Sequence, residues 1–444
     1  MQSSTLAYAD LASLVEGALA CAAESGATAA DVGISVDTGL GVTVRLGEVE
    51  TLEYQRDRGM GVTVYVGQKK GTATTGDLSA SAIADTVRKA VSIARFTAAD
   101  ACAGLPDPDT LARDIPDLDL SHPWDLDAEA GIALAKRCED AARATDPRIT
   151  NSEGASVSAH QSLRVYGNSL GFLAGFPSSY YSVSCVVMGA QGDQQERDYW
   201  YSAARRAEDL ESPESIGQRA AQRTVQRLGA RRLKTTRAPV VFVPELARGL
   251  LGHFLGAIRG GAQYRKSTFL LDAAGTQVFP DFFDLSERPH VPRALGSAPF
   301  DGEGCATFDR ELVARGVLGG YVLSTYSARQ LGLKTTGNAG GVHNLLVKPG
   351  TDDFASLLKR MGRGLVVTEL MGQGVNGVTG DYSRGAAGFW VEGGELAYPV
   401  SEITIAGNLK DMYRSVAAVG SDVDRRGAIQ TGSWLLDTMT IAGE

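Results

Sequence analysis

Glycine, more than any other feature, constrains what this chain can fold into. The 444 residues include 53 glycines, of which 32 lie in residues 236–444 and 20 in residues 301–400 alone. They form no G-x-y period and no Gly/Ser tract, which excludes a collagen-like chain and a flexible linker. Because glycine allows positive φ, and because 43% of the residues are apolar, we expect a globular protein whose second half turns tightly and often.

Charge and the absence of a long apolar run exclude several classes of partner. The 52 acidic residues outnumber the 43 basic residues, for a formal net charge of −9. Binding to nucleic acid needs a basic face, so we expect no nucleic-acid partner. The N-terminus lacks the basic start and apolar core of a signal peptide, and no stretch is apolar enough to span a bilayer. We therefore expect a cytoplasmic protein without a membrane segment.

Helical and strand periodicities alternate in residues 1–235. Apolar residues recur at helical spacing in four segments, which predicts helices at residues 7–25, 78–96, 127–145 and 214–228. Between residues 31 and 66 the period is two, in four short runs that glycines separate, which predicts an antiparallel meander of four strands with turns or bulges at Gly39, Gly41, Gly47, Gly59 and Gly67. Residues 155–201 predict longer strands with turns at 167–171 and 189–192. We expect an α+β domain over 1–235.

A basic joint at Arg231, Arg232, Lys234 and Arg237 precedes a change in pattern. We therefore place a domain boundary after residue 235, with a glycine-rich, β-rich domain over residues 236–444. The helices expected there are 244–258 and 353–361, and the short strands expected there are 240–243, 316–326, 345–347, 365–370, 388–391 and 403–405.

Two familiar motifs occur without the context that their chemistry needs. Residues 372–377 match the dinucleotide pattern GxGxxG, but turn formers and no helix follow them, so no dipole could face a pyrophosphate. Residues 167–171 match GxSxG, but no helix follows to build a nucleophile elbow, so we interpret Ser169 as a turn residue. We predict neither a nucleotide site nor a serine nucleophile.

Histidines and cysteines are too scattered for a familiar zinc or disulfide pattern. The five cysteines lie at least 36 residues apart, and no two of the five histidines are closer than 37. Two zinc ligands from one helix are therefore impossible, and the thiols are expected to be reduced and mostly buried. His253 lies in an apolar helix between Gly252 and Gly256, where helix packing explains it better than metal binding. We predict no metal site in this chain.

Several long segments in the second half resemble the TldD/PmbA family, and within it the PmbA branch, also called TldE. They are residues 264–272 (YRKSTFLLD), 300–304 (FDGEG), 336–344 (TGNAGGVHN), 368–376 (TELMGQGVN), 379–385 (TGDYSRG) and 402–409 (EITIAGNL). The resemblance implies a link to zinc metallopeptidases. TldD-type members carry HExxxH on a helix and a later cysteine ligand, and they pair with a TldE-type subunit to degrade unfolded peptides and mature peptide antibiotics.

This chain departs from that zinc motif. An ungapped comparison anchored on residues 264–265 places the two histidines on Gly252 and Ala257 and the glutamate on His253. A shift of one residue places the first histidine on His253 but leaves Phe254 and Ile258 for the others. The last cysteine is Cys305, so no thiolate follows, and no glutamate is present to activate water. The resemblance therefore implies no catalytic residue and no cofactor here, with zinc expected in a partner subunit.

The resemblance implies a TldD-type partner and an unfolded or extended peptide as substrate. Six polar residues in the resembling segments are candidates for peptide contact or for fixing loops: Arg265, Asn338, Asn344, Asn376, Asp381 and Arg384. Two alternatives stay open. The chain could be an independent metallopeptidase with a cryptic site, or a homodimeric peptide-binding protein that does not cleave.

Overall fold

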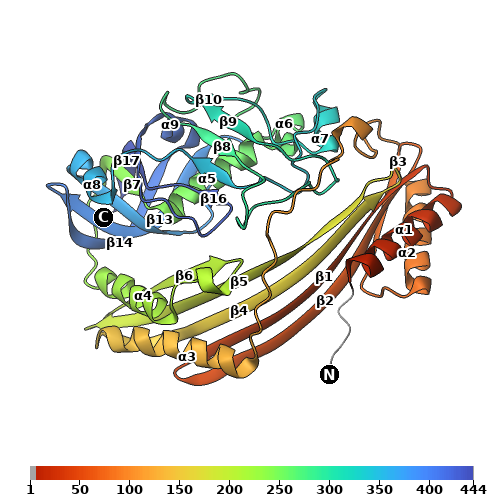
Figure 1. Ribbon diagram of the computed structural model, residues 1–444. Coiled ribbons are helices and arrows are strands. Elements are labelled where there is room, and N and C mark those ends of the chain that lie inside the picture. The colour runs from red at the N-terminus through yellow and green to blue at the C-terminus, as the bar shows by residue number, and fades with distance from the viewer. Residues whose placement is uncertain (1–6, 444) are drawn as a thin grey trace.

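The first half of the chain builds one long antiparallel sheet. The computed structural model describes residues 7–443. The sheet has six strands in the order β3-β2-β1-β4-β5-β6. Figure 1 shows them arching beneath the second half of the chain. The strands are β1 (Ala29–Arg45), β2 (Glu48–Val66), β3 (Lys69–Thr75), β4 (Ile149–Asn168), β5 (Leu173–Gln191) and β6 (Gln194–Ala204).

Four helices cover one face of this sheet. They are α1 (Tyr8–Glu24), α2 (Ala80–Phe96), α3 (Ala128–Thr145) and α4 (Pro213–Arg227), and short 3-10 turns lie at Pro108–Thr110 and Ala207–Asp209. Alternate residues of a strand face the same side, and in β1 these are apolar. Val32 and Ile34 pack with residues of α1 and α2, whereas Val42 and Val44 pack with residues of α3 and α4. The helix bounds agree closely with the periodicity of the sequence, and the mixed α+β class is confirmed.

The expected meander of four short strands between residues 31 and 66 is wrong. This segment forms only the two long strands β1 and β2, and β3 follows as a strand that was not predicted. Of the glycines expected to turn the chain, Gly47 and Gly67 have positive φ and do so, whereas Gly39, Gly41 and Gly59 lie inside strands. At Gly39 a Cβ atom would lie 2.2 Å from Nδ1 of His160 in the neighbouring strand, so this glycine makes room for a side chain.

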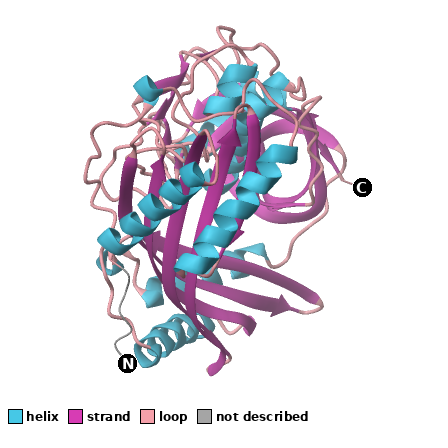
Figure 2. Cartoon of the chain, turned by 90° about the vertical axis from the view of Figure 1, so that its right-hand side faces the viewer, coloured by secondary structure: helices cyan, strands magenta, loops and turns pink. Residues whose placement is uncertain are grey.

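The second half contains a sheet that closes on itself. Its strands have the order β14-β13-β12-β7-β17-β15, and β14 also pairs with β17. Figure 2 shows this curled sheet as a ring beside the long strands. A smaller sheet has the order β10-β9-β8-β11-β16. The strands are β7 (Thr236–Phe242), β8 (Leu285–Glu287), β9 (Arg310–Ala314), β10 (Val317–Leu318), β11 (Leu345–Val347), β12 (Gly364–Met371), β13 (Asp381–Glu392), β14 (Glu395–Asn408), β15 (Val416–Val419), β16 (Ile429–Gln430) and β17 (Trp434–Ala442).

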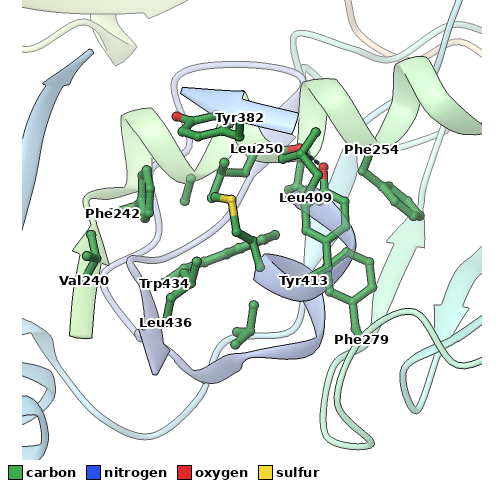
Figure 3. Close-up of a cluster of buried hydrophobic side chains, with 14 of the residues drawn as sticks. Val240, Phe242, Leu250, Phe254, Phe279, Tyr382, Leu409, Tyr413, Trp434 and Leu436 are labelled. Atoms are coloured by element: carbon green, nitrogen blue, oxygen red, sulfur yellow. Dashed lines mark hydrogen bonds between the residues drawn. The ribbon is translucent and has the colours of Figure 1, made fainter. Parts of the chain in front are cut away.

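Five helices lie among these strands in the second half of the described chain, and one face of α5 packs in the core. They are α5 (Pro244–Ile258), α6 (Gly260–Tyr264), α7 (Thr325–Gln330), α8 (Phe354–Met361) and α9 (Leu409–Arg414). The core in Figure 3 joins Leu250 and Phe254 of α5 to Tyr413 of α9 and Trp434 of β17. The hydroxyl of Tyr413 donates to the Leu250 carbonyl at 2.8 Å. Helix α5 is therefore held in a fixed position relative to the curled sheet.

The strand expected at residues 316–326 is mostly wrong. Only Val317 and Leu318 are extended, as β10, and the segment then passes into helix α7. Ser324 caps that helix by accepting from the Ser327 backbone N–H. A serine cap with a polar residue three positions later favours helix over strand, and the pattern of apolar residues alone did not include this signal.

Side chains join the two halves at many places, among them the following three. Arg205 of the loop after β6 donates to the carbonyl oxygens of Ala294 and Leu295 in the second half, at 3.1 and 3.0 Å. The ring of Phe300 meets Phe172 and Phe176 edge-on at 5.2 and 5.5 Å. On α7, the Tyr326 hydroxyl donates to Asp100. The boundary after residue 235 stays a proposal. None of the helices within residues 7–443 is long and apolar enough to cross a membrane.

Candidate functional site: helix α5 and strand β13

Helix α5 carries the three positions that correspond to the family's zinc motif in the sequence comparison. Pro244 opens the helix at a position where a missing N–H costs nothing, and apolar residues at helical spacing bury one face. Ala257 belongs to that buried face, whereas Gly252 is exposed and a Cβ there would meet nothing within 4 Å. His253 lies between these extremes and is half-buried. At these three positions the helix therefore offers one imidazole and no second ligand.

Strand β13 places an aromatic ring and a cation beside this imidazole. The His253 and Tyr382 rings meet edge-on with centroids 6.1 Å apart. Arg384 lies two residues along the same strand, and so on the same face as Tyr382. Burial, and after it the positive charge of Arg384, lower the pKa of His253 below its usual 6.5. Both effects favour the neutral form of the imidazole.

Two polar atoms of β13 at this point lack a hydrogen-bond partner among the described residues. They are the Tyr382 hydroxyl and Nε of Arg384, and both atoms are buried. The Tyr382 side chain is 2% exposed, and Figure 3 shows it at the margin of the core, over Leu250. Buried polar groups usually have a partner, so unpaired ones mark a place where a ligand or water can bind. Neutral or anionic hydrogen-bonding groups would suit this set.

These residues do not fit a catalytic zinc ion. Zinc in a hydrolase takes three protein ligands, and α5 supplies a single candidate at these positions. The guanidinium of Arg384 would repel a cation at His253, as its effect on the pKa of that histidine indicates. A glutamate to activate water is missing as well. The chemistry of the donor set therefore argues against zinc-dependent hydrolysis at this place.

One other group of potential metal ligands lies elsewhere, in the loop before β9. Among the described residues, Asp301, Glu303 and Cys305 bring ligand atoms within 4.8 Å of one another. The Asp301 carboxylate already accepts the backbone N–H groups of Glu303, Cys305 and Ala339, and Glu303 accepts that of Thr325. These bonds explain the cluster as the frame of a loop.

The hairpin between β12 and β13 contains Asn376 and Asp381. The Asn376 side-chain oxygen accepts from the backbone of Val378 and Thr379, at 2.9 and 3.3 Å. Asp381 accepts from the Thr379 hydroxyl and the Asn408 amide, and these bonds lower the pKa of its carboxyl. Both side chains are exposed and both shape the turn. The same hairpin holds the GxGxxG match, and β13 rather than a helix follows it.

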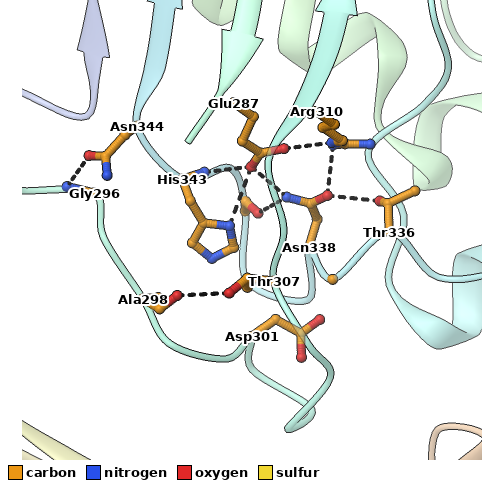
Figure 4. Close-up of polar contacts among 12 residues, drawn as sticks. Glu287, Gly296, Ala298, Asp301, Thr307, Arg310, Thr336, Asn338, His343 and Asn344 are labelled. Atoms are coloured by element: carbon orange, nitrogen blue, oxygen red, sulfur yellow. Dashed lines mark hydrogen bonds and ion pairs between the residues drawn. The ribbon is translucent and has the colours of Figure 1, made fainter. Parts of the chain in front are cut away.

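Asn338 and Asn344 belong to a buried polar network around Glu287, drawn in Figure 4. Glu287 is 2% exposed and accepts from Arg310, the Asn338 amide and the His343 backbone N–H, at 2.7, 2.8 and 2.6 Å. Asn344 is fully buried, and its amide bonds the backbone of Gly296 and Arg288. Their amides thus hold the loops between the strands of the smaller sheet, and peptide contact by these two residues stays a proposal.

Arg265 ends α6 and is exposed. Its guanidinium donates to the hydroxyl of Tyr264 at 2.9 Å.

The structure distributes the six predicted residues over separate places. Only Arg384 joins the zinc-motif positions, Asn376 and Asp381 share the hairpin, and Asn338 and Arg265 lie near a pocket described below. Tyr382 was not predicted, although its place between Asp381 and Arg384 in a resembling segment was a signal that could have identified it.

Comparison with known proteins places the chain in a family. Models of three domains match it: PmbA/TldA metallopeptidase domain 1 over residues 30–94, the central domain over 121–228 and the C-terminal domain over 235–443. Metalloprotease PmbA of Escherichia coli O157:H7 is 52% identical over 415 residues, covering 94% of this chain and 92% of that protein. A PmbA homologue of Haemophilus influenzae is 50% identical over 435 residues, covering 98% and 96%.

Solved structures agree with these relationships. The crystal structure of a proposed DNA gyrase modulator from Bacteroides thetaiotaomicron superimposes with a TM-score of 0.94 at 27% identity, over 99% of this chain and 100% of that one. TldE from Thermococcus kodakarensis has the same fold, with a TM-score of 0.85 at 19% identity over 97% and 100% of the chains. The chain therefore belongs to the PmbA/TldD metallopeptidase family, as its motifs indicate, and within that family to the PmbA branch.

Proposed function

We propose that this chain is the non-catalytic, TldE-type subunit of a two-subunit metallopeptidase that degrades unfolded peptides and processes peptide substrates. The observation that supports this most strongly is the composition of α5. The positions of the family's zinc motif hold Gly252, His253 and Ala257, and Arg384 places a positive charge beside the only imidazole. Zinc and the base that activates water would come from a TldD-type subunit.

The work left to this chain is to pair with that subunit and to hold an extended peptide. The long sheet arches beneath the second half (Figure 1). It ends in β3 and β6, whose outer edges pair with no further strand among the described residues. Adding a strand to a sheet edge uses main-chain hydrogen bonds, which suits substrates of many sequences. A peptidase that degrades unfolded chains needs such tolerance.

Sequence relatives support a TldD-type partner. A TldD homologue of Haemophilus influenzae is 21% identical to this chain over 394 residues, so both types share one family. Related chains can pair through equivalent surfaces, as two copies of one chain do. In the absence of the partner, this chain would be able to form a homodimer. The cytoplasm is the compartment we propose for the complex.

The decisive experiment compares each subunit alone with both together. The purified chain, a TldD-type subunit and their mixture are incubated with casein, and each sample is analysed for zinc. We expect co-purification, zinc only in the TldD-type subunit, and cleavage that requires it. Stoichiometric zinc and cleavage in the isolated chain would establish an independent metallopeptidase instead. Peptide binding without pairing or cleavage in any mixture would establish a homodimeric binding protein.

A further inference from the structure

A pocket of about 300 Å³ lies where α5 ends and α6 begins. Three chain segments form it: the α5–α6 junction, the start of α7 and the turn around Gly340. Its lining residues are Arg259, Gly260, Gly261, Tyr264, Val322, Ser324, Tyr326, Ser327, Asn338, Gly340 and Gly341. The size is that of a site for a small ligand or for one end of a larger one.

The lining of this pocket carries positive charge only. Arg259 is the only charged residue among those that line the pocket, and none of them is an aspartate or a glutamate. No hydrogen bond or ion pair joins the Arg259 guanidinium to another described residue, and the residue is exposed. A Cβ on Gly341 would be 3.9 Å from its Nη2 atom, so the side chain extends across the pocket toward that turn. In a chain of net charge −9, such a cation is available for an anionic ligand.

A second guanidinium lies at the rim. A Cβ on Gly261 would be 3.2 Å from Nη2 of Arg265, which places that group directly over the glycine. Arg265 bonds the Tyr264 hydroxyl and has no carboxylate partner among residues 7–443. Planar guanidinium groups bind carboxylates through paired N–H donors, so two of them beside one small pocket favour a carboxylate over a neutral group.

The rest of the pocket suits a short piece of peptide. At Gly340 and Gly341 the lack of side chains leaves backbone groups open to an approaching main chain, whereas Gly260 is packed against Ser327 of α7. The turn beneath them is rigid, because Gly341 donates to the Asn338 carbonyl and Asn338 donates back to Gly341. Tyr264 and Tyr326 meet edge-on at 6.0 Å and form an aromatic wall.

We propose that this pocket binds the C-terminal carboxylate of a peptide, with Arg259 and Arg265 as its binding residues. The inference rests on the proposed function, in which the chain holds peptides, and it names the peptide end that the chain recognises. The glycine floor then accommodates the last residue's backbone, and the tyrosines contact its side chain.

Paired peptides test this proposal. The protein is the complex of this chain with a TldD-type subunit that has been inactivated by removal of its zinc. We measure the binding of a fluorescent unstructured peptide to this complex, once with a free C-terminus on the peptide and once with a C-terminal amide. We expect the free acid to bind at least tenfold more tightly in the wild type. Arg259→Gln and Arg265→Gln should each remove most of that difference, while Arg259→Lys should retain part of it. Arg414→Gln, at an exposed arginine of α9, is the matched control and should leave the difference unchanged.

Two outcomes would overturn the proposal. One is equal affinity for acid and amide in the wild type. The other is competition by inorganic phosphate as strong as that by an N-acetylated amino acid, because this would indicate a general anion pocket. If the complex cleaves casein but shows no preference for the free acid, the carboxylate proposal fails and the proposed function stands. If the subunits do not pair, binding of the N-acetylated amino acid to the isolated chain still tests the pocket. Thermal midpoints of the variants distinguish lost binding from misfolding.

Discussion

The imidazole of His253 on α5 meets the ring of Tyr382 on β13 edge-on, with 6.1 Å between their centroids. This contact joins a position of the family's zinc motif to a residue whose hydroxyl is buried without a partner among the described residues. Arg384 adds a positive charge to the same place. The site therefore has the properties of a positively charged, hydrogen-bonding surface, and a zinc centre would require different residues at these positions.

The positive charge of Arg384 should have a measurable effect on the pKa of His253. Arg384→Gln removes the cation that helps to lower the pKa of this histidine, while burial, the larger cause, remains. The pKa of His253 should therefore rise in the variant but stay below about 6.5. The measurement is the pH dependence of the imidazole NMR signals, with His253 assigned by its loss in His253→Ala. An unchanged pKa would mean that the two side chains do not interact.

Removal of the His253 imidazole should not change the zinc content of the reconstituted complex. If zinc belongs to the partner, His253→Ala leaves the zinc content of the reconstituted complex unchanged, because no zinc ligand is lost. Cleavage of casein should change by less than about threefold, since no group is removed that supplies general acid–base catalysis. Elemental analysis and initial rates provide the two measurements. Loss of stoichiometric zinc in this variant would show that His253 is a ligand after all.

Two helical glycines should respond in opposite ways to the same substitution. A Cβ on Gly217 of α4 would lie 2.0 Å from the Cys138 carbonyl oxygen of α3, whereas one on exposed Gly252 of α5 would meet nothing within 4 Å. Gly217→Ala forces the packed helices apart, and we expect a loss of about 1–3 kcal/mol in the free energy of unfolding. Gly252→Ala should gain about 0.5–1 kcal/mol, because alanine favours helix.

Chemical denaturation of both variants provides the measurement, and each serves as the control for the other. A similar change of stability in both would show that helix propensity, rather than the close approach of α3 and α4, decides the outcome. A loss at Gly252 in the isolated chain would show that the exposed face of α5 is covered there.

Asp31 on β1 should make the stability depend on pH. Burial raises the pKa of its carboxyl to about 7, Lys70 opposes this, and the charge of Glu303 adds to it. The unfolded chain releases this proton near pH 3.8, so the folded chain binds more protons between the two values. The stability contributed by Asp31 is therefore complete below pH 3.8 and is lost as the pH rises toward 7.

Asp31→Asn retains a polar side chain near Thr63 and removes the titration. Relative to the wild type, the variant should gain about 2–3 kcal/mol in the free energy of unfolding between pH 5 and pH 8. Denaturation at the two pH values measures the difference, and Asp85→Asn at an exposed position of α2 is the matched control. A constant difference across this range would contradict a raised pKa.

The longer helices were predictable because their signal is local, whereas the long strands β1 and β2 were expected as four short ones. Residues 214–228, for example, show helical spacing, and α4 spans Pro213–Arg227. The glycines were harder to interpret, because the same residue serves different purposes. Gly47 turns the chain with positive φ, whereas Gly39 stays extended and makes room for His160 of β4. A partner 121 residues away along the chain is not visible in a local pattern.

By itself, the sequence determined the α+β class, the family and the departure from the zinc motif, since each depends on which residues occur and in what order. Only the tertiary structure decided which polar residues lie together. Asn338 and Asn344 use their amides inside a buried network, while Arg384 acts electrostatically on His253, from which it is 131 residues away along the chain. Arg259 lines one pocket and Arg265 lies at its rim, because α5 ends where α6 begins, and the glycine turn at residues 340–341 forms another part of the same pocket. Such neighbours are set by how helices and sheets pack, which depends on contacts between distant segments.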